Sequence, residues 1–369
     1  MNDRAHSEPS LAGGERIVAE FQIPYRQYLD GSGKLVGEAP AFAGDREIVI
    51  PLYRAMVLTR TFDNKAIALQ RTGQLGTYPS CVGEEAVGVG YASVMTDKDV
   101  MLTTYREQAA QIWRGVTLTE LLLYWGGDER GCDYKGPRED FPVAVPIATQ
   151  VPHAVGVATA FKLRREPRVA VCALGDGATS KGDFYESVNL AGVWRLPVVF
   201  VVINNGWAIS VPVAKQTATK TLAQKAVAGG IPGIQIDGND VIAVREAVGE
   251  AIERARSGGG ASLIEALTYR MRDHTTADDA TRYRREEEVS AAWKLDPILR
   301  LRTYLGAKGW WSKEDEERLI GECKEKVEAA VAEYLAIPPP RPESIFDHLF
   351  ETLPASLQWQ RDKLAGGSR

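Results

Sequence analysis

Two short polar motifs follow two apolar runs of the chain, and their residue types are suited to binding a metal ion. Gly175-Asp176-Gly177 follows the apolar run 169–174, and Asn204-Asn205-Gly206 follows the apolar run 197–203. Residues 183–194 have helical spacing, so the pattern predicts two buried parallel strands joined by a helix. Ligands of open α/β sheets lie at the carboxyl ends of neighbouring strands, so we expect Asp176 and Asn205 to lie close together although 29 positions separate them. A carboxylate and an amide oxygen are hard ligands, which suit Mg²⁺ or Ca²⁺ rather than zinc.

Neither of the two familiar phosphate-binding loops matches this stretch. A dinucleotide fingerprint requires glycine where Ser180 stands, and a P-loop requires lysine and then serine or threonine where Asp183 and Phe184 stand. Each polar motif alone is usually an ordinary turn or strand end. The two together, at matched strand ends, favour a ligand site of another kind.

Two further strand ends carry reactive residue types. The predicted strand 100–102 is followed by Tyr105-Arg106, and the guanidinium fork of an arginine suits phosphate oxygens, although a surface salt bridge is the alternative. The predicted strand 262–269 is followed by a loop that contains His274 among arginines and carboxylates. Histidine is the side chain best suited to proton transfer near neutral pH, and its neighbours would tune it. The alternative is a histidine that is merely exposed.

Composition narrows the class of protein. The chain has 369 residues, 44% of them hydrophobic, and a formal net charge of −5, which argues against a nucleic-acid binder. Its four cysteines lack C-x-x-C spacing, so we expect reduced thiols and a cytoplasmic protein. No apolar run approaches the length of a membrane span, and the first residues lack the apolar core of a signal peptide.

The order of elements predicts an α/β fold, with a parallel sheet flanked by helices. Strands and helices alternate from residue 168 to residue 269. Residues 126–146 form a long loop rich in glycine, proline and charge, and loops of this length are often functional. We expect a partly disordered arm at 1–44, an α/β domain at 45–340 that ends in a helical C-terminal region, and a tail at 341–369.

The metal-binding pattern resembles the diphosphate-and-metal motif of thiamine diphosphate enzymes. The resemblance implies the thiamine diphosphate-binding fold and two cofactors, thiamine diphosphate and Mg²⁺. It implies that Asp176, Asn205 and the main-chain carbonyl of Trp207 hold the metal against the diphosphate. The flanking residues Gly175, Gly177 and Ala178 would then contact the cofactor. Ile203 is a departure, because many relatives carry arginine or glutamine there, which puts one phosphate contact in doubt.

Two other segments look like the alpha subunits of 2-oxo acid dehydrogenases. TTYREQAAQIWRG resembles their diphosphate-binding segment, and the loop after Tyr269 resembles their active-site loop. On this resemblance His274 would contact the cofactor and the bound 2-oxo acid or its adduct, and would assist transfer to the lipoyl group. Thr275 occupies the position of a phosphorylated serine in animal relatives, from which we infer no phosphorylation here. The resemblance gives a cofactor contact to Tyr105, Arg106 and Val145, a cofactor-supporting position to Ile147, for which core packing is an equal alternative, and loop-ordering roles to Arg270, Tyr283 and Arg284.

The resemblance covers residues 45–355. KTLAQKAVAGGIPGIQIDGND and DDATRYR look most like the alpha subunits of bacterial heterotetrameric pyruvate dehydrogenases, whereas NNGWAISVP also resembles the branched-chain 2-oxo acid enzymes. Such alpha subunits act in an α2β2 assembly with a lipoyl-bearing acyltransferase, and the glutamate that activates the cofactor lies on the beta subunit. We therefore expect the chain alone to be inactive. The alternatives are a branched-chain 2-oxo acid dehydrogenase, an acetoin dehydrogenase and a non-catalytic structural subunit.

Overall fold

The computed structural model describes residues 16–366, and its centre is a six-stranded sheet. All strand pairs in the sheet are parallel, in the order β1-β7-β8-β4-β3-β2. This confirms the predicted α/β class with a parallel sheet. The strands of the sheet are β1 (Tyr25–Arg26), β2 (Val100–Leu102), β3 (Ala170–Gly175), β4 (Val198–Asn204), β7 (Gly233–Asp237) and β8 (Ser262–Leu267), and a separate antiparallel hairpin contains β5 (Trp207–Ala208) and β6 (Val211–Pro212).

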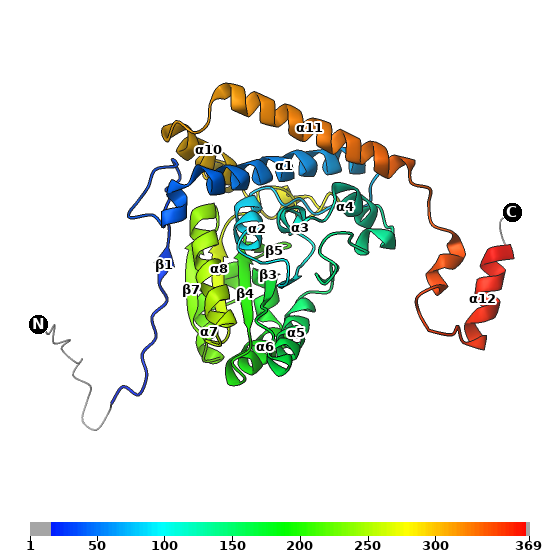
Figure 1. Cartoon of the computed structure of the whole chain (residues 1–369), viewed down its shortest axis with the longest axis horizontal. Helices are drawn as coiled ribbons and strands as arrows, with labels where there is room; N and C mark the ends of the chain where they lie inside the picture. Colours follow the sequence, from blue (N-terminus) through cyan, green and yellow to red (C-terminus); the bar gives the residue numbers. More distant parts are fainter. Residues whose placement is uncertain (1–15, 367–369) are drawn as a thin grey trace, which may run out of the picture.

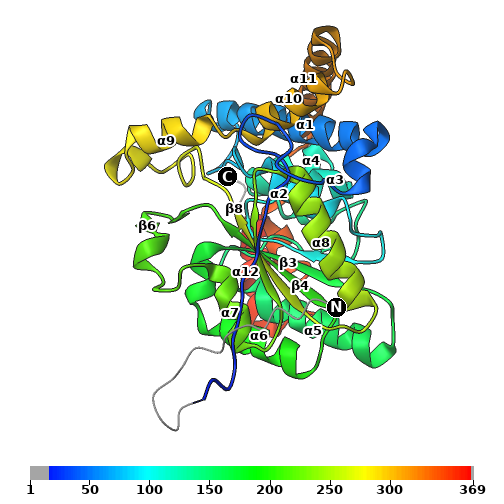
Figure 2. The same ribbon diagram turned by 90° about the vertical axis from the view of Figure 1, so that its left-hand side faces the viewer.

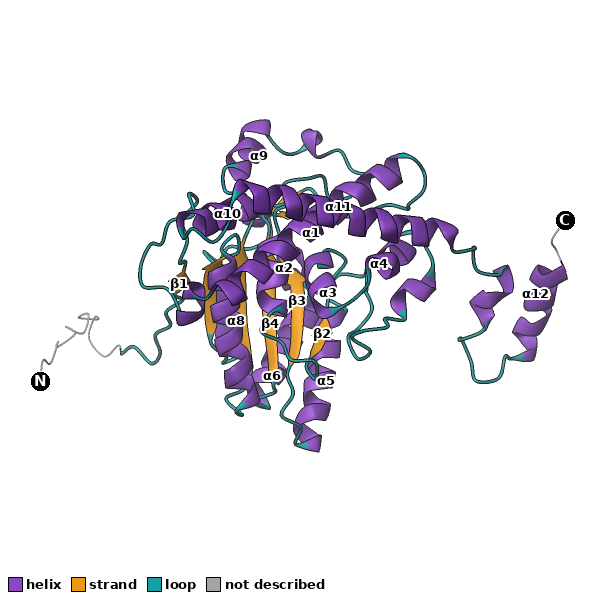
Figure 3. Cartoon of the chain, turned by 45° about the horizontal axis from the view of Figure 1, so that its top comes forward, coloured by secondary structure: helices purple, strands orange, loops and turns teal. Residues whose placement is uncertain are grey.

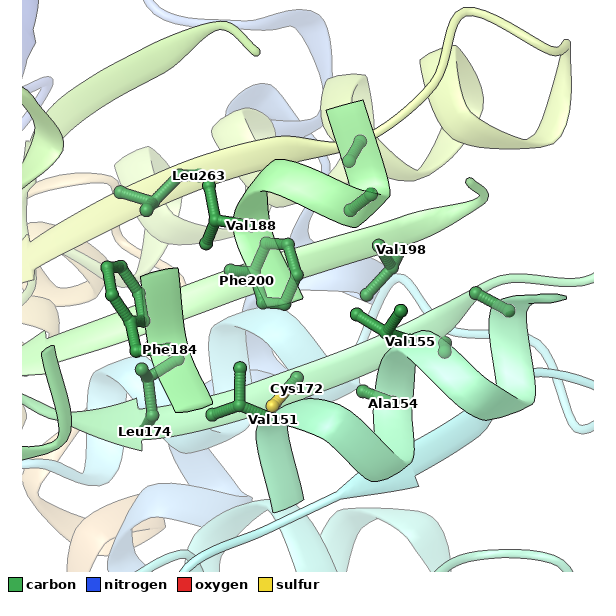
Figure 4. Close-up of a cluster of buried hydrophobic side chains, with 14 of the residues drawn as sticks. Val151, Ala154, Val155, Cys172, Leu174, Phe184, Val188, Val198, Phe200 and Leu263 are labelled. Carbon is green, nitrogen blue, oxygen red and sulfur yellow. The ribbon is translucent and has the colours of Figure 1, made fainter. Parts of the chain in front are cut away.

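The neighbouring strands β3 and β4 are apolar almost to their ends because both faces of the sheet are buried. In β3, Cys172 and Leu174 point into one hydrophobic cluster, whereas Val171 and Ala173 point into the other. β4 alternates in the same way, with Phe200 in the first cluster. Figure 4 shows the first cluster, where side chains of β3 and β4 meet those of α5 and α6. Successive side chains of a strand point to opposite faces of the sheet, and here both faces are buried. The two strands therefore have no polar residue until they end.

Helices cover both faces and add an outer layer. α5 and α6 pack on one face, and α2 and α8 pack on the other. α1, α10 and α11 form the outer layer, in which α11 runs along α1 (Figures 1 and 3). The helices are α1 (Arg46–Arg71), α2 (Glu85–Ala92), α3 (Gln108–Arg114), α4 (Leu118–Trp125), α5 (Gln150–Arg164), α6 (Gly182–Val193), α7 (Lys225–Ala228), α8 (Val241–Arg256), α9 (Glu286–Trp293), α10 (Pro297–Ala307), α11 (Lys313–Ala336) and α12 (Ala355–Gly366).

Capping side chains mark where α8 and α10 begin. Asp240 caps α8 as expected, accepting hydrogen bonds from the backbone N–H groups of Ile242 and Ala243. The helical spacing of residues 293–309 predicts one amphipathic helix, but the segment is divided between α9 and α10, because Asp296 caps a new helix that starts at Pro297. The sequence TLAQKAVA predicts a short helix over residues 221–228, but this segment begins as a 3₁₀ turn and continues as α7.

The two ends of the described chain lie away from the sheet. Figure 1 shows the N-terminal segment leaving the body past β1, and α12 standing apart from the helical layers. The disordered start that the sequence predicts falls on residues 1–15, which lie outside the described residues. Within residues 16–366, no helix is both long enough and apolar enough to cross a membrane.

Candidate active site at the carboxyl ends of the strands

The strand ends bring the predicted residues into one cavity of about 200 Å³. Gly175 at the end of β3 pairs in register with Ile203 of β4, so Asp176 and Asn205 follow at the same edge of the sheet. Every residue for which the sequence predicted a metal or cofactor contact lines this cavity: Tyr105, Arg106, Val145, Ile147, Gly175, Asp176, Gly177, Ala178, Asn205, Trp207 and His274.

Close backbone packing shapes the side of the cavity where the sequence predicts a metal site. An added Cβ at Gly177 would lie 2.7 Å from the Cβ of Ala208, so the turn after β3 packs against β5 only with glycine at that position. Gly206 has a φ of 88°, a left-handed conformation that favours glycine, and it turns the chain between Asn205 and Trp207. The glycines of both motifs therefore shape the cavity.

Asp176 is a buried carboxylate, 3% exposed. Its Oδ2 accepts a hydrogen bond of 2.7 Å from Nε2 of Gln216. Burial raises the pKa of Asp176, while the Gln216 hydrogen bond and the charge of Arg270 lower it. Asp176 forms no ion pair with another side chain of the described chain. It is therefore suited to bind a metal cation, because a bound cation would offset the cost of burying the carboxylate.

Asn205 is held on two sides. Its Nδ2 donates to Oε1 of Glu84 at 2.8 Å, and its Oδ1 accepts from the backbone N–H of Trp207 at 3.2 Å. The carbonyl of Trp207 accepts a long hydrogen bond of 3.3 Å from Nη1 of Arg270. Burial raises the pKa of Glu84 to about 7, against the opposing effects of Arg106 and of the Asn205 hydrogen bond.

Arg106 lies buried between two loops of the site. Its guanidinium donates to the carbonyl of Ser80 and to the carbonyl of His274, at 2.5 and 2.9 Å. It lies 5.6 Å from the ring centroid of Tyr105, whose ring packs edge-on against His274. The surface salt bridge that was the alternative for Arg106 is therefore excluded, because the side chain is internal.

His274 faces two positive charges. Nη2 of Arg106 and Nη1 of Arg270 both lie 3.2 Å from its Nδ1. A guanidinium can only donate, so Nδ1 must accept, and the proton of the neutral ring belongs on Nε2. Burial, with the charges of Arg106 and Arg270, lowers the pKa of His274 to about 4, and Asp278 opposes them. Near neutral pH this imidazole is therefore a neutral donor through Nε2–H.

A second set of contacts orders the loop that carries His274. The backbone N–H of His274 donates to Oδ2 of Asp278 at 2.9 Å, and the hydroxyl of Tyr283 donates to the same oxygen. Nη2 of Arg270 donates to the Tyr283 hydroxyl at 2.9 Å, and Arg284 donates to the carbonyl of Arg270. The side chains of Asp278, Tyr283, Arg270 and Arg284 are not among the lining residues, so they order the loop from outside the cavity, and Arg270 also contacts the lining residues His274 and Trp207.

Apolar residues form the mouth of the cavity. Val145 and Ile147 are 55% and 45% exposed, which excludes core packing for Ile147. Ile209 is also exposed and has a positive φ of 55°, an uncommon conformation for a β-branched residue. Figure 2 shows β6 and α9 projecting from the same side of the body.

Sequence reasoning missed several polar residues of the site, among them Thr104 and Glu107, which line the cavity on either side of the predicted Tyr105 and Arg106. Glu84 and Gln150 line the cavity, and Gln216 contacts Asp176 from outside the lining set. The sequence holds a signal that could have pointed to Glu84. Two adjacent glutamates stand at the start of α2, a helix that has no exposed residue. Gln216 lies in a polar loop without a distinguishing pattern, so only the fold reveals it.

Comparison with known proteins gives consistent matches over most of the chain. The model of the family "Dehydrogenase E1 component" matches residues 53–343. The 3-methyl-2-oxobutanoate dehydrogenase subunit alpha of Mycobacterium tuberculosis is 43% identical over 313 residues, 85% of each chain. The pyruvate dehydrogenase E1 component subunit alpha of Acholeplasma laidlawii is 40% identical over 90% of this chain and 97% of its own. That of Staphylococcus epidermidis is 39% identical over 94% of each.

Proposed function

Because the chain belongs to the dehydrogenase E1 component family, as an alpha subunit of a 2-oxo acid dehydrogenase, we propose that it is the alpha subunit of a pyruvate dehydrogenase. The reaction is the oxidative decarboxylation of pyruvate and the reductive acetylation of the lipoyl group of an acyltransferase. The family depends on thiamine diphosphate, which supplies a nucleophilic carbon and an electron sink when bound. The observation that supports the proposal is the convergence of Asp176, Asn205, Arg106 and His274 on one cavity.

The divalent cation in this proposal is Mg²⁺, held by the Asp176 carboxylate, Oδ1 of Asn205 and the carbonyl of Trp207. The donor set fits, because oxygen atoms of a carboxylate, an amide and a main chain are the ligands that hard cations take. Among residues 16–366 no group of three or more His, Cys, Asp or Glu residues is placed to bind a metal. The proposed site, built from one carboxylate and two neutral oxygens, is of a different kind.

The remaining lining residues would bind the cofactor. Tyr105 and Arg106 would contact the diphosphate, since the Arg106 guanidinium lies at the cavity wall. Ile147 would support the aminopyrimidine, with backbone contacts from Val145. Further contacts would come from the turn after β3, at Gly175, Gly177 and Ala178.

His274 would act as a neutral hydrogen-bond donor. Its Nε2–H is free to donate because Nδ1 is taken by Arg106 and Arg270. We propose that it contacts the bound cofactor and substrate and donates a hydrogen bond through Nε2–H during transfer to the lipoyl group, while the neutral ring keeps this proton. A general-base role at neutral pH would need Nδ1 to be available, and two guanidinium groups occupy it.

A beta subunit completes the site in this proposal, in a cytoplasmic α2β2 assembly. The cavity mouth exposes Val145, Ile147 and Ile209, and exposed apolar side chains around a polar cavity are typical of a surface that a partner covers. Glu84 bonds Asn205 inside the wall, so it is not free to activate the cofactor. We therefore propose that the activating glutamate comes from the partner.

A branched-chain 2-oxo acid is the second candidate substrate, because the relative from Mycobacterium tuberculosis is named for 3-methyl-2-oxobutanoate and is 43% identical. A pyruvate dehydrogenase and a branched-chain 2-oxo acid dehydrogenase would both use every site residue named above. They differ only in the size of the apolar pocket for the substrate side chain, and such pockets discriminate by roughly 10–200-fold.

The test is carbon dioxide release by the chain purified with its beta partner, with thiamine diphosphate and Mg²⁺. Pyruvate, 3-methyl-2-oxobutanoate and acetoin are compared, with an artificial electron acceptor that also reports acetoin oxidation. Higher kcat/KM for pyruvate supports the proposal. Preference for 3-methyl-2-oxobutanoate or oxidation of acetoin alone reassigns the substrate, and no turnover of any of them points to a non-catalytic subunit.

A further inference from the structure

Glu84 is a buried carboxylate of the site to which no sequence motif gave a role. It stands at the start of α2, is 4% exposed, and lines the cavity. Its Oε1 accepts from Nδ2 of Asn205 at 2.8 Å, and Nε of Arg106 lies 3.8 Å from the same oxygen. One carboxylate therefore contacts the proposed metal side and the proposed phosphate side of the cavity.

This contact fixes which end of the Asn205 amide faces which way. A carboxylate accepts hydrogen bonds, so the NH₂ group of Asn205 must face Glu84. On the other side the backbone N–H of Trp207 donates, so the oxygen must face Trp207. An amide oxygen has two lone pairs, and the Trp207 N–H uses one of them. The second stays available, and the flipped amide would offer a cation two hydrogens instead.

We propose that Glu84 is a positioning residue that keeps the oxygen of Asn205, and not its NH₂ group, available to the divalent cation, and thereby sets the affinity of the site for that cation. This inference rests on the proposed function, because it assumes that Asn205 is a metal ligand. Outer partners that orient a metal ligand typically change metal affinity by 10–100-fold when they are removed.

The competing role for Glu84 is charge compensation of Arg106. The geometry favours the amide, since the Asn205 hydrogen bond is 2.8 Å long and the separation from Arg106 is 3.8 Å. Arg106 also has two carbonyl partners of its own, on Ser80 and His274. The two roles predict different behaviour for glutamine, which keeps an acceptor oxygen but loses the charge.

The neighbouring Glu85 offers a matched control. It is as buried as Glu84 and begins the same helix, but it pairs with Arg60 and accepts from the backbone N–H of Gly83. A change at Glu85 therefore tests what loss of a buried glutamate does to the fold of this region without touching the Asn205 amide.

The experiment titrates Mg²⁺ against thiamine diphosphate binding by the chain in complex with its beta partner, followed by calorimetry. We expect Glu84→Leu to raise the half-saturating Mg²⁺ concentration about 10- to 100-fold, Glu84→Gln to stay within about threefold of wild type, and Glu85→Leu to lower the melting temperature without this shift. Mg²⁺ affinity unchanged in Glu84→Leu overturns the inference, as do equal losses in Glu84→Leu and Glu84→Gln, which would assign Glu84 to Arg106. Absence of Mg²⁺-dependent binding in the wild type would instead refute the proposed function.

A swapped pair keeps the inference testable where Glu84→Leu fails to assemble. Asn205→Asp alone places two carboxylates in contact, so Mg²⁺ affinity or stability should fall. Asn205→Asp with Glu84→Gln restores one donor and one acceptor across the contact, so the double variant should bind Mg²⁺ more tightly than Asn205→Asp alone. A double variant that binds no better than Asn205→Asp contradicts the inference.

Discussion

The pair of guanidinium groups beside His274 leads to a quantitative prediction about its protonation. With a pKa of about 4, about 1% of His274 is protonated at pH 6, whereas a histidine with an ordinary pKa of 6.5 would be about three quarters protonated. Arg106→Met removes one of the two facing charges and keeps an apolar stem. We expect the pKa to rise by about one unit, because burial and Arg270 still act. At pH 5 the protonated fraction should then increase from about 9% to about half.

The assay is NMR titration of ¹³C-labelled histidine in the complex with the beta partner, with the His274 signal identified by its loss in His274→Gln. Arg130→Met is the control, since Arg130 is an exposed arginine that pairs with Asp128. The reasoning is refuted if wild-type His274 titrates near pH 6.5, or if Arg106→Met and Arg130→Met give the same curve.

The same shift has a consequence for stability. The folded-state pKa of His274 is lower than the unfolded one, so the unfolded chain binds the proton more readily. The contribution to stability is present above about pH 6.5 and is lost as the pH falls toward 4. After allowance for solvent screening of this part-exposed ring, we expect a loss of about 1–2 kcal/mol over that range, which His274→Gln should abolish in denaturant unfolding.

Three further predictions follow from the site. Asp176→Asn should weaken Mg²⁺-dependent cofactor binding at least about 100-fold without lowering the melting temperature, because it removes a carboxylate whose burial is unfavourable; unchanged cofactor binding would revive the non-catalytic alternative. Gly206→Ala should lower the free energy of unfolding by about 1–2 kcal/mol, since the φ of 88° disfavours a Cβ, whereas Gly156→Ala, inside α5 with open space around it, should not. The chain without its beta partner should release no carbon dioxide from pyruvate, and robust turnover by the isolated chain would contradict the shared site.

Much of the fold was predictable because a strand that is buried on both faces of the sheet is a continuous apolar run in the sequence. The strands β3 and β4 are continuous apolar runs that end abruptly at polar residues, and the structure places those ends side by side. Residues 241–256 have the apolar spacing of a helix, and α8 has these bounds, since Asp240 caps its start and a glycine run follows its end.

The site was predictable only where residue type and strand position coincide. Asp176 and Asn205 each follow a strand directly, and Arg106 comes four positions after the end of β2, so the topology of a parallel sheet places them together. Glu84 and Gln216 reach the same place from a helix start and a loop, and no local pattern specifies their partners. The low pKa of His274 could not be predicted from the sequence either, because it depends on Arg106, which lies 168 positions away.

The central claim is that this chain holds thiamine diphosphate through a divalent cation at the ends of β3 and β4. The most direct measurement is calorimetric titration of thiamine diphosphate into the complex of the chain with its beta partner, once with Mg²⁺ and once with a chelator. The account predicts saturable binding of one cofactor per alpha chain with Mg²⁺ and none with the chelator. Binding that is absent, or that is the same in both conditions, would contradict it.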